Sequence, residues 1–136
     1  DPASSRTAQE QIAASKFFTK DSGDSLTAAW RGTVFLNPPY AQPLISQFVE
    51  KVTTEQGIIA AIVLVNNATE TEWGQRLLRW GNAVCFPSGR IKFWHPDKIS
   101  APLQGQMIVY QGAGVSEFIT GFAEFGPCLL SADRRM

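Results

Sequence analysis

The sequence is poor in the features that mark secreted and metal-binding proteins. It has two cysteines, Cys85 and Cys128, which form neither a disulfide framework nor a metal-binding spacing. We therefore expect both to be reduced core residues, as in a cytoplasmic protein. The single histidine, His95, has no second histidine or cysteine near it, which argues against a metal site.

Long apolar runs and an excess of charge are also lacking. No apolar run approaches the ~20 residues that span a bilayer, and the first residues have no signal-peptide pattern. The formal net charge is zero, so a nucleic-acid partner would have to be met by a local basic patch. With 44% hydrophobic and 18% charged residues, the 136-residue chain is expected to be a single folded domain, residues 1–136, with no membrane partner.

Apolar runs and amphipathic segments alternate along the chain. The continuous run 57–65, "GIIAAIVLV", is typical of a central parallel strand because it is apolar on both faces. Similar patterns predict further strands at 32–36, 83–87 and 106–111, and helices at 6–15, 43–52, 70–80 and 115–125. This alternation indicates an α/β layered sheet.

The segment "FLNPPYAQPL", residues 35–44, places two prolines directly after a predicted strand. In open α/β sheets, ligands bind beyond the carboxyl ends of the strands. Pro38 and Pro39 keep the chain extended and leave carbonyl groups free. The side-chain oxygen of Asn37 and the carbonyl of Pro38 offer two acceptors, which suit the two hydrogens of an amino group. Tyr40 offers a flat face for the ring that carries this group.

This motif resembles the Asn/Asp-Pro-Pro-aromatic motif of S-adenosylmethionine-dependent amino-methyltransferases. The chain is similar over almost its whole length to the phage-type DNA N6-adenine methyltransferases of the Dam family. The resemblance rests on "DPASS", "KFFTKDSGDSLTAAWRGTVFLNPPY", "IVLVNNATETEW", "VCFPSGRIKFW" and "APLQGQMIVY", which follow one another in family order. It implies a Rossmann-like methyltransferase sheet with helices on both faces.

The resemblance also implies roles for individual residues. Asn37 and Pro38 would accept the hydrogens of the adenine N6, Pro39 belongs to the same catalytic motif, and Tyr40 would stack on the flipped base. The cofactor S-adenosylmethionine would contact two short segments. Asp1, with Pro2 beside it, would lie near the methionine and ribose portions, and Asp24, with Leu26 nearby, would hold the cofactor adenine.

Two further segments are candidates for contact with double-stranded DNA. Arg90 and Lys92 alternate with apolar residues, which fits a solvated strand edge, but the family context favours phosphate contacts, with Phe93 near the target base. Asn66 and Asn67 follow a predicted central strand on the binding side. They are either turn-forming residues or, as we favour, substrate contacts.

Family members carry an aromatic-Thr-Pro motif and a first strand before the "DPAS" segment, and both would lie before Asp1. The expectation is therefore a sheet that lacks its N-terminal strand, with the edge of the 32–36 strand exposed. Weak or absent binding of the cofactor would follow, and the chain would either self-associate through that edge or belong to a longer product.

The sequence thus predicts methyl transfer from S-adenosylmethionine to adenine N6 in DNA by a phage or prophage protein in the bacterial cytoplasm. Catalysis would rest on orientation of a flipped base, without a metal or a covalent intermediate. One alternative is a protein-glutamine methyltransferase, in which the same acceptors would hold a side-chain amide. The other is a nucleic-acid-binding remnant that keeps the fold and has lost catalysis.

Overall fold

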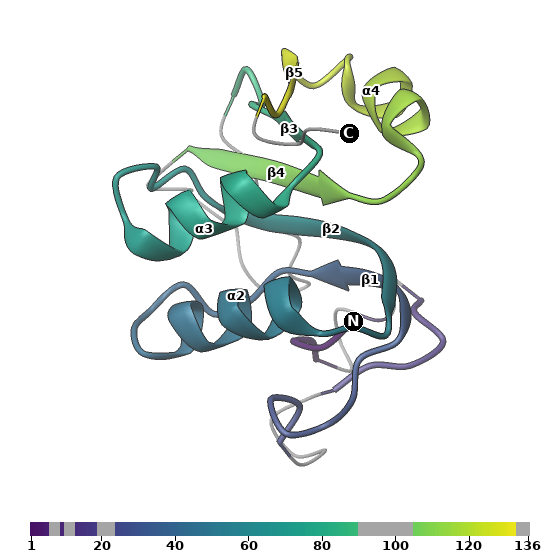
Figure 1. Cartoon of the computed structure of the whole chain (residues 1–136), viewed down its shortest axis with the longest axis vertical. Helices are drawn as coiled ribbons and strands as arrows, with labels where there is room; N and C mark the ends of the chain where they lie inside the picture. Colours follow the sequence, from purple (N-terminus) through teal and green to yellow (C-terminus); the bar gives the residue numbers. More distant parts are fainter. Residues whose placement is uncertain (6–8, 10–12, 19–23, 90–104, 133–136) are drawn as a thin grey trace.

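The computed structural model describes residues 1–5, 9, 13–18, 24–89 and 105–132. Within these residues the chain forms one five-stranded mixed sheet. The strands are β1 (Gly32–Leu36), β2 (Ile58–Asn66), β3 (Ala83–Cys85), β4 (Gln106–Gln111) and β5 (Cys128–Leu130), and their order in the sheet is β1-β2-β4-β3-β5 (Figure 1).

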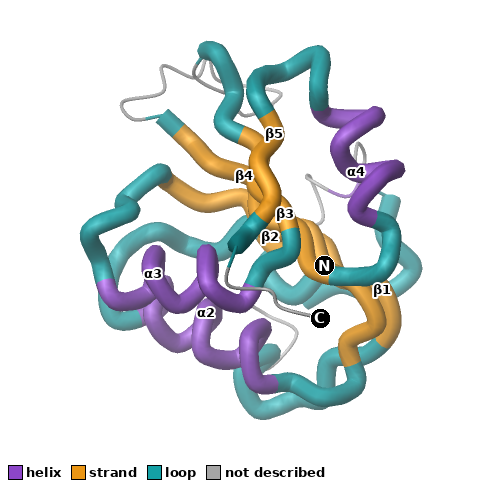
Figure 2. Tube along the Cα trace, turned by 45° about the horizontal axis from the view of Figure 1, so that its top comes forward, coloured by secondary structure: helices purple, strands orange, loops and turns teal. Residues whose placement is uncertain are grey.

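Helices cover both faces of this sheet, so the predicted α/β class is confirmed. On one face, α2 (Leu44–Thr54) and α3 (Glu72–Trp80) pack side by side, and α4 (Val115–Phe122) lies on the other (Figure 2). The sheet therefore separates two apolar cores. The larger core joins α2 and α3 to Val34, Leu36, Val63, Val65, Met107 and Val109, and the smaller joins α4 to Ala83, Cys85, Ile108 and Tyr110.

The expectation for run 57–65 was only half right. The strand lies inside the sheet and runs parallel to β1, but it is antiparallel to β4 on its other side. The pairings of β3 with β4 and with β5 are antiparallel as well. An apolar run shows that a strand is buried on both faces but carries no information on the direction of its neighbours.

Other predicted elements agree with the structure except at their ends. The strand expected at 83–87 ends at Cys85, and the helix expected at 115–125 ends at Phe122. Most of the helix expected at 6–15 falls outside the described residues, and the described residues 13–15 are not helical. Strand β5 was not predicted, because three residues are too few for a period to be recognised.

The start of α3 is held by a tight turn that follows β2. Thr71 caps the helix, because its side-chain oxygen accepts a hydrogen bond from the backbone nitrogen of Gly74. The Thr71 hydroxyl also donates to the carbonyl of Ala68 at 2.7 Å. Gly74 packs directly against that carbonyl, so a Cβ atom at this position would overlap the oxygen. The turn and the first turn of the helix thus form one close-packed unit.

The two parallel strands end at the same edge of the sheet, where β4 begins (Figure 1). Leu36, the last residue of β1, pairs with Val63, so β2 extends three residues further to Asn66. Asn66 is directly opposite Gln106, the first residue of β4. Asn37, which follows β1, therefore lies at the same end of the sheet as Asn66 and Gln106. We call this end of the sheet the carboxyl edge.

One lateral margin of the sheet is formed by β1. Among the described residues, β1 pairs only with β2, and no described strand precedes it in the chain. Self-association through this margin stays a prediction.

Both cysteines are free thiols, as expected, but only Cys85 is fully buried, and Cys128 is half-buried against the smaller core. They lie opposite each other on β3 and β5, and burial raises the pKa of the Cys85 thiol to about 11. At neutral pH that thiol is therefore protonated and unreactive.

Candidate functional site

A cleft lies beside the segment that follows β1. We call it the NPPY cleft; its volume is about 400 Å³, within the usual range of small-molecule sites. It is lined by Pro2, Ala3, Ser4, Phe18, Asp24, Ser25, Leu26, Asn37, Pro38, Pro39, Leu44 and Phe48. The structure thus brings three of the four predicted catalytic residues together with three of the four predicted cofactor residues. The roles assigned to these residues stay predictions.

Tyr40, the fourth residue of the motif, is half-buried and packs against the larger core. Its hydroxyl donates to the side-chain oxygen of Asn37 at 2.6 Å and lies 3.4 Å from the carbonyl oxygen of Leu64 on β2. Burial raises the pKa of this hydroxyl, so it remains a proton donor at neutral pH. Through these two contacts, Tyr40 links the Asn37 side chain to the end of β2.

The hydrogen bond from Tyr40 leaves Asn37 able to act on a ligand. An amide oxygen has two lone pairs, so Asn37 Oδ1 retains one acceptor position. Pro38 is buried and Pro39 is exposed, and neither has a backbone N–H to compete for that oxygen. Asn37 therefore presents a fixed acceptor at the wall of the NPPY cleft.

Asp24 lies in the turn that precedes β1 and is exposed. One of its carboxylate oxygens accepts a hydrogen bond from the backbone nitrogen of Leu26 at 2.9 Å, so Asp24 stabilises the turn in which it lies. Leu26 in turn packs against the larger core. The second carboxylate oxygen of Asp24 has no hydrogen-bond partner among the described residues, and the residue lines the NPPY cleft.

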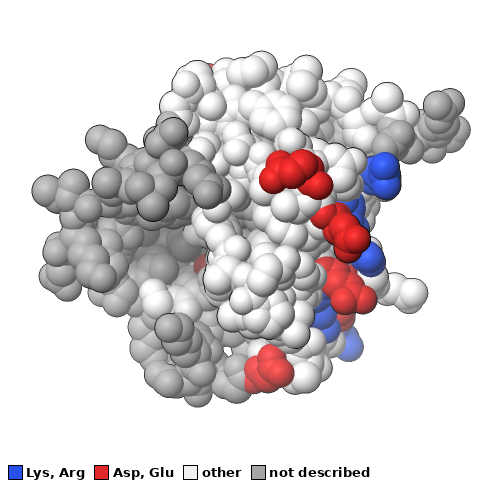
Figure 3. Space-filling view, turned by 90° about the vertical axis from the view of Figure 1, so that its left-hand side faces the viewer, with Lys and Arg blue, Asp and Glu red and all other residues white. Residues whose placement is uncertain are grey.

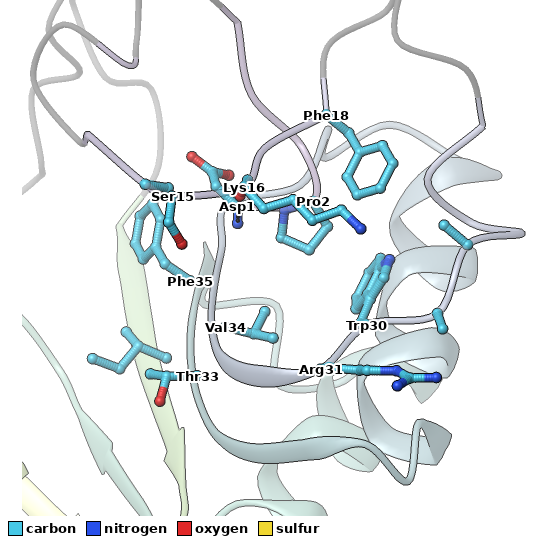
Figure 4. Close-up of a pocket in the computed structure, with 14 residues that line it drawn as sticks. Asp1, Pro2, Ser15, Lys16, Phe18, Trp30, Arg31, Thr33, Val34 and Phe35 are labelled. Carbon is cyan, nitrogen blue, oxygen red and sulfur yellow. Dashed lines mark hydrogen bonds between the residues drawn. The ribbon is translucent and has the colours of Figure 1, made fainter.

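A second cleft of about 660 Å³ lies along the free margin of β1; we call it the edge cleft. Asp1, Pro2 and Phe18 lie across from the side chains of Trp30 and Phe35 (Figure 4). Pro2 and Phe18 line both clefts, so the two are neighbours.

Asp1 lines the edge cleft rather than the NPPY cleft. One of its carboxylate oxygens accepts from Gln9 Nε2 at 2.8 Å, whereas the other is buried and has no hydrogen-bond partner within the described part of the chain. A buried carboxylate oxygen without a donor is costly unless a ligand or water supplies one. The second oxygen of Asp1 is therefore a candidate acceptor for a ligand group.

The predicted DNA contacts are only partly described. Asn66 is half-buried and accepts from Gln106 Nε2 at 2.7 Å, whereas Asn67 is exposed and its backbone nitrogen donates to the carbonyl of Gly105. Neither asparagine lines the NPPY cleft, although both are at the carboxyl edge. Arg90, Lys92 and Phe93 lie outside the described residues, as does His95.

Charges on the described surface are of both signs and gather at one side. Figure 3 looks toward the carboxyl edge, with acidic and basic side chains interspersed at its right-hand side and an uncharged described surface between them and the grey atoms. The exposed charged residues of α2 and α3 and their connections are Glu50, Glu70, Glu72, Arg76 and Arg79. The described residues of this face therefore form no basic patch.

Two further classes of site are not seen in the described part of the chain. Its histidine, cysteine and acidic side chains form no group of three or more that could hold a metal ion. None of its helices has the length and apolar composition needed to cross a membrane.

Several residues of this region were not predicted from the sequence. Leu44 and Phe48 of α2 line the NPPY cleft, and Gln106 contacts Asn66. The amphipathic pattern of α2 indicated that Phe48 is buried but not which cavity it borders. A glutamine at the start of a strand gives no sequence signal for burial.

The mixed α/β sheet, with an Asn-Pro-Pro-Tyr segment at a cleft beyond a parallel strand end, defines a methyltransferase-like domain. The profile of the DNA N-6-adenine-methyltransferase (Dam) family matches residues 4–113. The chain belongs to this family, and the resemblance found in the sequence is thereby confirmed. No curated protein and no solved structure matches the chain.

Membership of this family implies S-adenosylmethionine as the usual methyl donor. The residues present fit such a cofactor. The second oxygens of Asp1 and Asp24 are acceptors for hydroxyl, amino or ammonium groups. Phe18 and Leu26 add apolar surface to the lining of the NPPY cleft.

Proposed function

We propose that this chain transfers a methyl group from S-adenosylmethionine to the N6 of adenine in DNA, and that Asn37 and Pro38 hold the reacting amino group. The observation that carries the proposal is the position of Asn37. Its side-chain oxygen is fixed by the Tyr40 hydroxyl and stands at the wall of a cleft that also contains Asp24 and Pro2.

The chemistry that these residues need to perform is orientation. The N6 lone pair of adenine is delocalised into the ring, so the amine is a poor nucleophile. Acceptors on both of its hydrogens draw the nitrogen out of conjugation, and this interaction strengthens as positive charge develops on nitrogen. The cofactor supplies an electrophilic methyl group on a sulfonium. The protein contributes position and desolvation.

The base must leave the duplex to reach this cleft, which costs a few kcal/mol of unstacking. In the proposed complex, the ring of Tyr40 stacks on the base and recovers about 1–3 kcal/mol of that cost. Pro38, which is buried, and Phe48 give the cleft an apolar wall that excludes water.

Transfer of label from methyl-labelled S-adenosylmethionine to duplex DNA tests the proposal. We expect labelled N6-methyladenine after digestion to nucleosides and none in the other bases. Label on protein glutamine instead would favour the amide-methylating alternative. If no label is transferred and S-adenosylhomocysteine causes no thermal shift, the result favours the nucleic-acid-binding remnant.

Replacing Tyr40 by Phe separates the role of its hydroxyl from that of its ring. Tyr40→Phe keeps the stacking surface but frees the amide of Asn37 to rotate, so we expect methyl transfer to fall about tenfold with little change in DNA affinity. Tyr40→Ala should weaken DNA binding as well. Single-turnover rates and anisotropy titrations distinguish the two variants, and equal loss of DNA affinity in both would rule out this division of roles.

A further inference from the structure

Gln106 is a buried polar residue in a strand whose other buried residues are apolar or aromatic. It is the first residue of β4, it is 5% exposed, and Met107, Ile108, Val109 and Tyr110 follow it. Its Nε2 donates to Asn66 Oδ1 at 2.7 Å, but its own Oε1 is buried and has no hydrogen-bond partner among the residues that the structure describes. Gln106 thus satisfies Asn66 and leaves one of its own groups unpaired.

Packing does not explain this choice of residue. An unpaired buried acceptor destabilises the folded state, whereas a leucine of similar size at the same place has no polar group to desolvate. If the side-chain amides of Gln106 and Asn66 were both rotated by 180°, the nitrogen of Gln106 would lack a partner instead of its oxygen. One polar atom of Gln106 would still be unpaired. Unsatisfied buried groups in proteins are rare and are associated with function.

The contact determines the direction of the Asn66 side chain. Because Oδ1 faces Gln106, Nδ2 is turned away from it, and Asn66 is only half-buried. Asn66 is two residues beyond Leu64, whose carbonyl lies near the Tyr40 hydroxyl, and the strand rise places it about 7 Å further along β2. The Asn66 amide therefore lies at the carboxyl edge, the same end of the sheet as the Asn37–Tyr40 pair.

We propose that Gln106 is a positioning residue that holds Asn66 so that its Nδ2 donates to a ring nitrogen of the target adenine. The inference rests on the proposed function, since the amino group of the same base is held at Asn37. Ring nitrogens of adenine are hydrogen-bond acceptors, and a directed amide N–H is a suitable donor for them. Asn66 would then recognise the ring while Asn37 recognises the amine.

The first test measures the thermal stability and the DNA binding of variants of Gln106 and Asn66. We expect Gln106→Leu to leave the melting temperature unchanged or to raise it, and to weaken binding of a duplex that the wild-type chain methylates by about tenfold. Asn66→Ala should weaken binding equally, and the double variant no further. The matched control is Gln111→Leu, the same substitution at the other end of β4, which should leave binding unchanged.

A lower melting temperature of Gln106→Leu together with unchanged DNA affinity would show that Gln106 serves the fold and would overturn the proposal. Additive losses in the double variant would also overturn it, because the two residues would then act separately.

The second test changes the DNA. The target adenine of the same duplex is replaced by 1-deaza-, 3-deaza- or 7-deazaadenine, each of which lacks one ring nitrogen. We expect one of the three to bind the wild-type chain about tenfold more weakly, and this difference to disappear in Asn66→Ala and Gln106→Leu. A purely structural role of Gln106 predicts no such selective change.

Equal binding of all three analogues by the wild-type chain would overturn the inference while leaving methyl transfer to N6 intact. Absence of N6-methyladenine in the labelling experiment would instead overturn the proposed function, and this inference with it.

Discussion

Replacing Asn37 by alanine should lower the rate of methyl transfer by about 100- to 1000-fold, which is the usual effect of removing one preorganised polar group from a reacting centre. The reason is that Asn37 Oδ1 contacts the amine most strongly in the transition state. S-adenosylhomocysteine binding, measured by calorimetry, should change little, because the proposed cofactor contacts are with Asp1 and Asp24. Single-turnover methylation at saturating DNA measures the chemical step.

The matched control is Asn37→Asp, which keeps an oxygen acceptor for both the amine and the Tyr40 hydroxyl. It should retain much more activity than Asn37→Ala. Turnover of Asn37→Ala within a few-fold of the wild-type rate would exclude Asn37 as the holder of the amine, and circular dichroism would show whether both variants are folded.

Gly74→Ala should destabilise the protein by about 3 kcal/mol, because the added Cβ overlaps the backbone carbonyl of Ala68 and lies 2.8 Å from Thr71 Oγ1. Backbone on one side and the N-terminal turn of α3 on the other leave no flexible side chain that can move away. A drop in melting temperature of roughly 10 °C is expected from thermal unfolding.

Gly121→Ala is the matched control for this substitution. Gly121 is also a helical glycine, but apart from its chain neighbours and the backbone of its own helix no described atom lies within 4 Å of the position that a Cβ would take. Here alanine should stabilise by up to about 1 kcal/mol through its higher helix propensity and raise the melting temperature by roughly 3 °C. A similar change in both variants would mean that contact with Ala68 does not decide the effect at position 74.

The order of elements and most of their positions could be predicted from the sequence, because they depend on local patterns. Strand β1 was expected at residues 32–36, where the structure has it. The direction of β4 was not predictable, since an antiparallel strand and a parallel strand buried on both faces have the same apolar composition. Direction depends on how the connecting chain returns to the sheet.

The location of the candidate site was predictable for a similar reason. Prolines end β1, and the parallel pairing of β1 with β2 places that end beside the end of β2. The contact of Tyr40 with Asn37 and Leu64 was not predictable, because it depends on how the chain bends after the prolines. Burial of Gln106 depends on its neighbours in the folded state.

The position of β1 at the margin of the sheet divides the proposed substrate site into two parts of unequal rigidity. Asn37 follows a strand that pairs with one described neighbour, whereas Asn66 and Gln106 belong to strands that are paired on both sides. Local opening of a sheet begins where backbone pairing is least complete. The part that holds the amine can therefore fluctuate with β1. The part proposed to recognise the ring is at the ends of two strands whose central residues are paired on both sides, although Asn66 and Gln106 themselves pair only with each other.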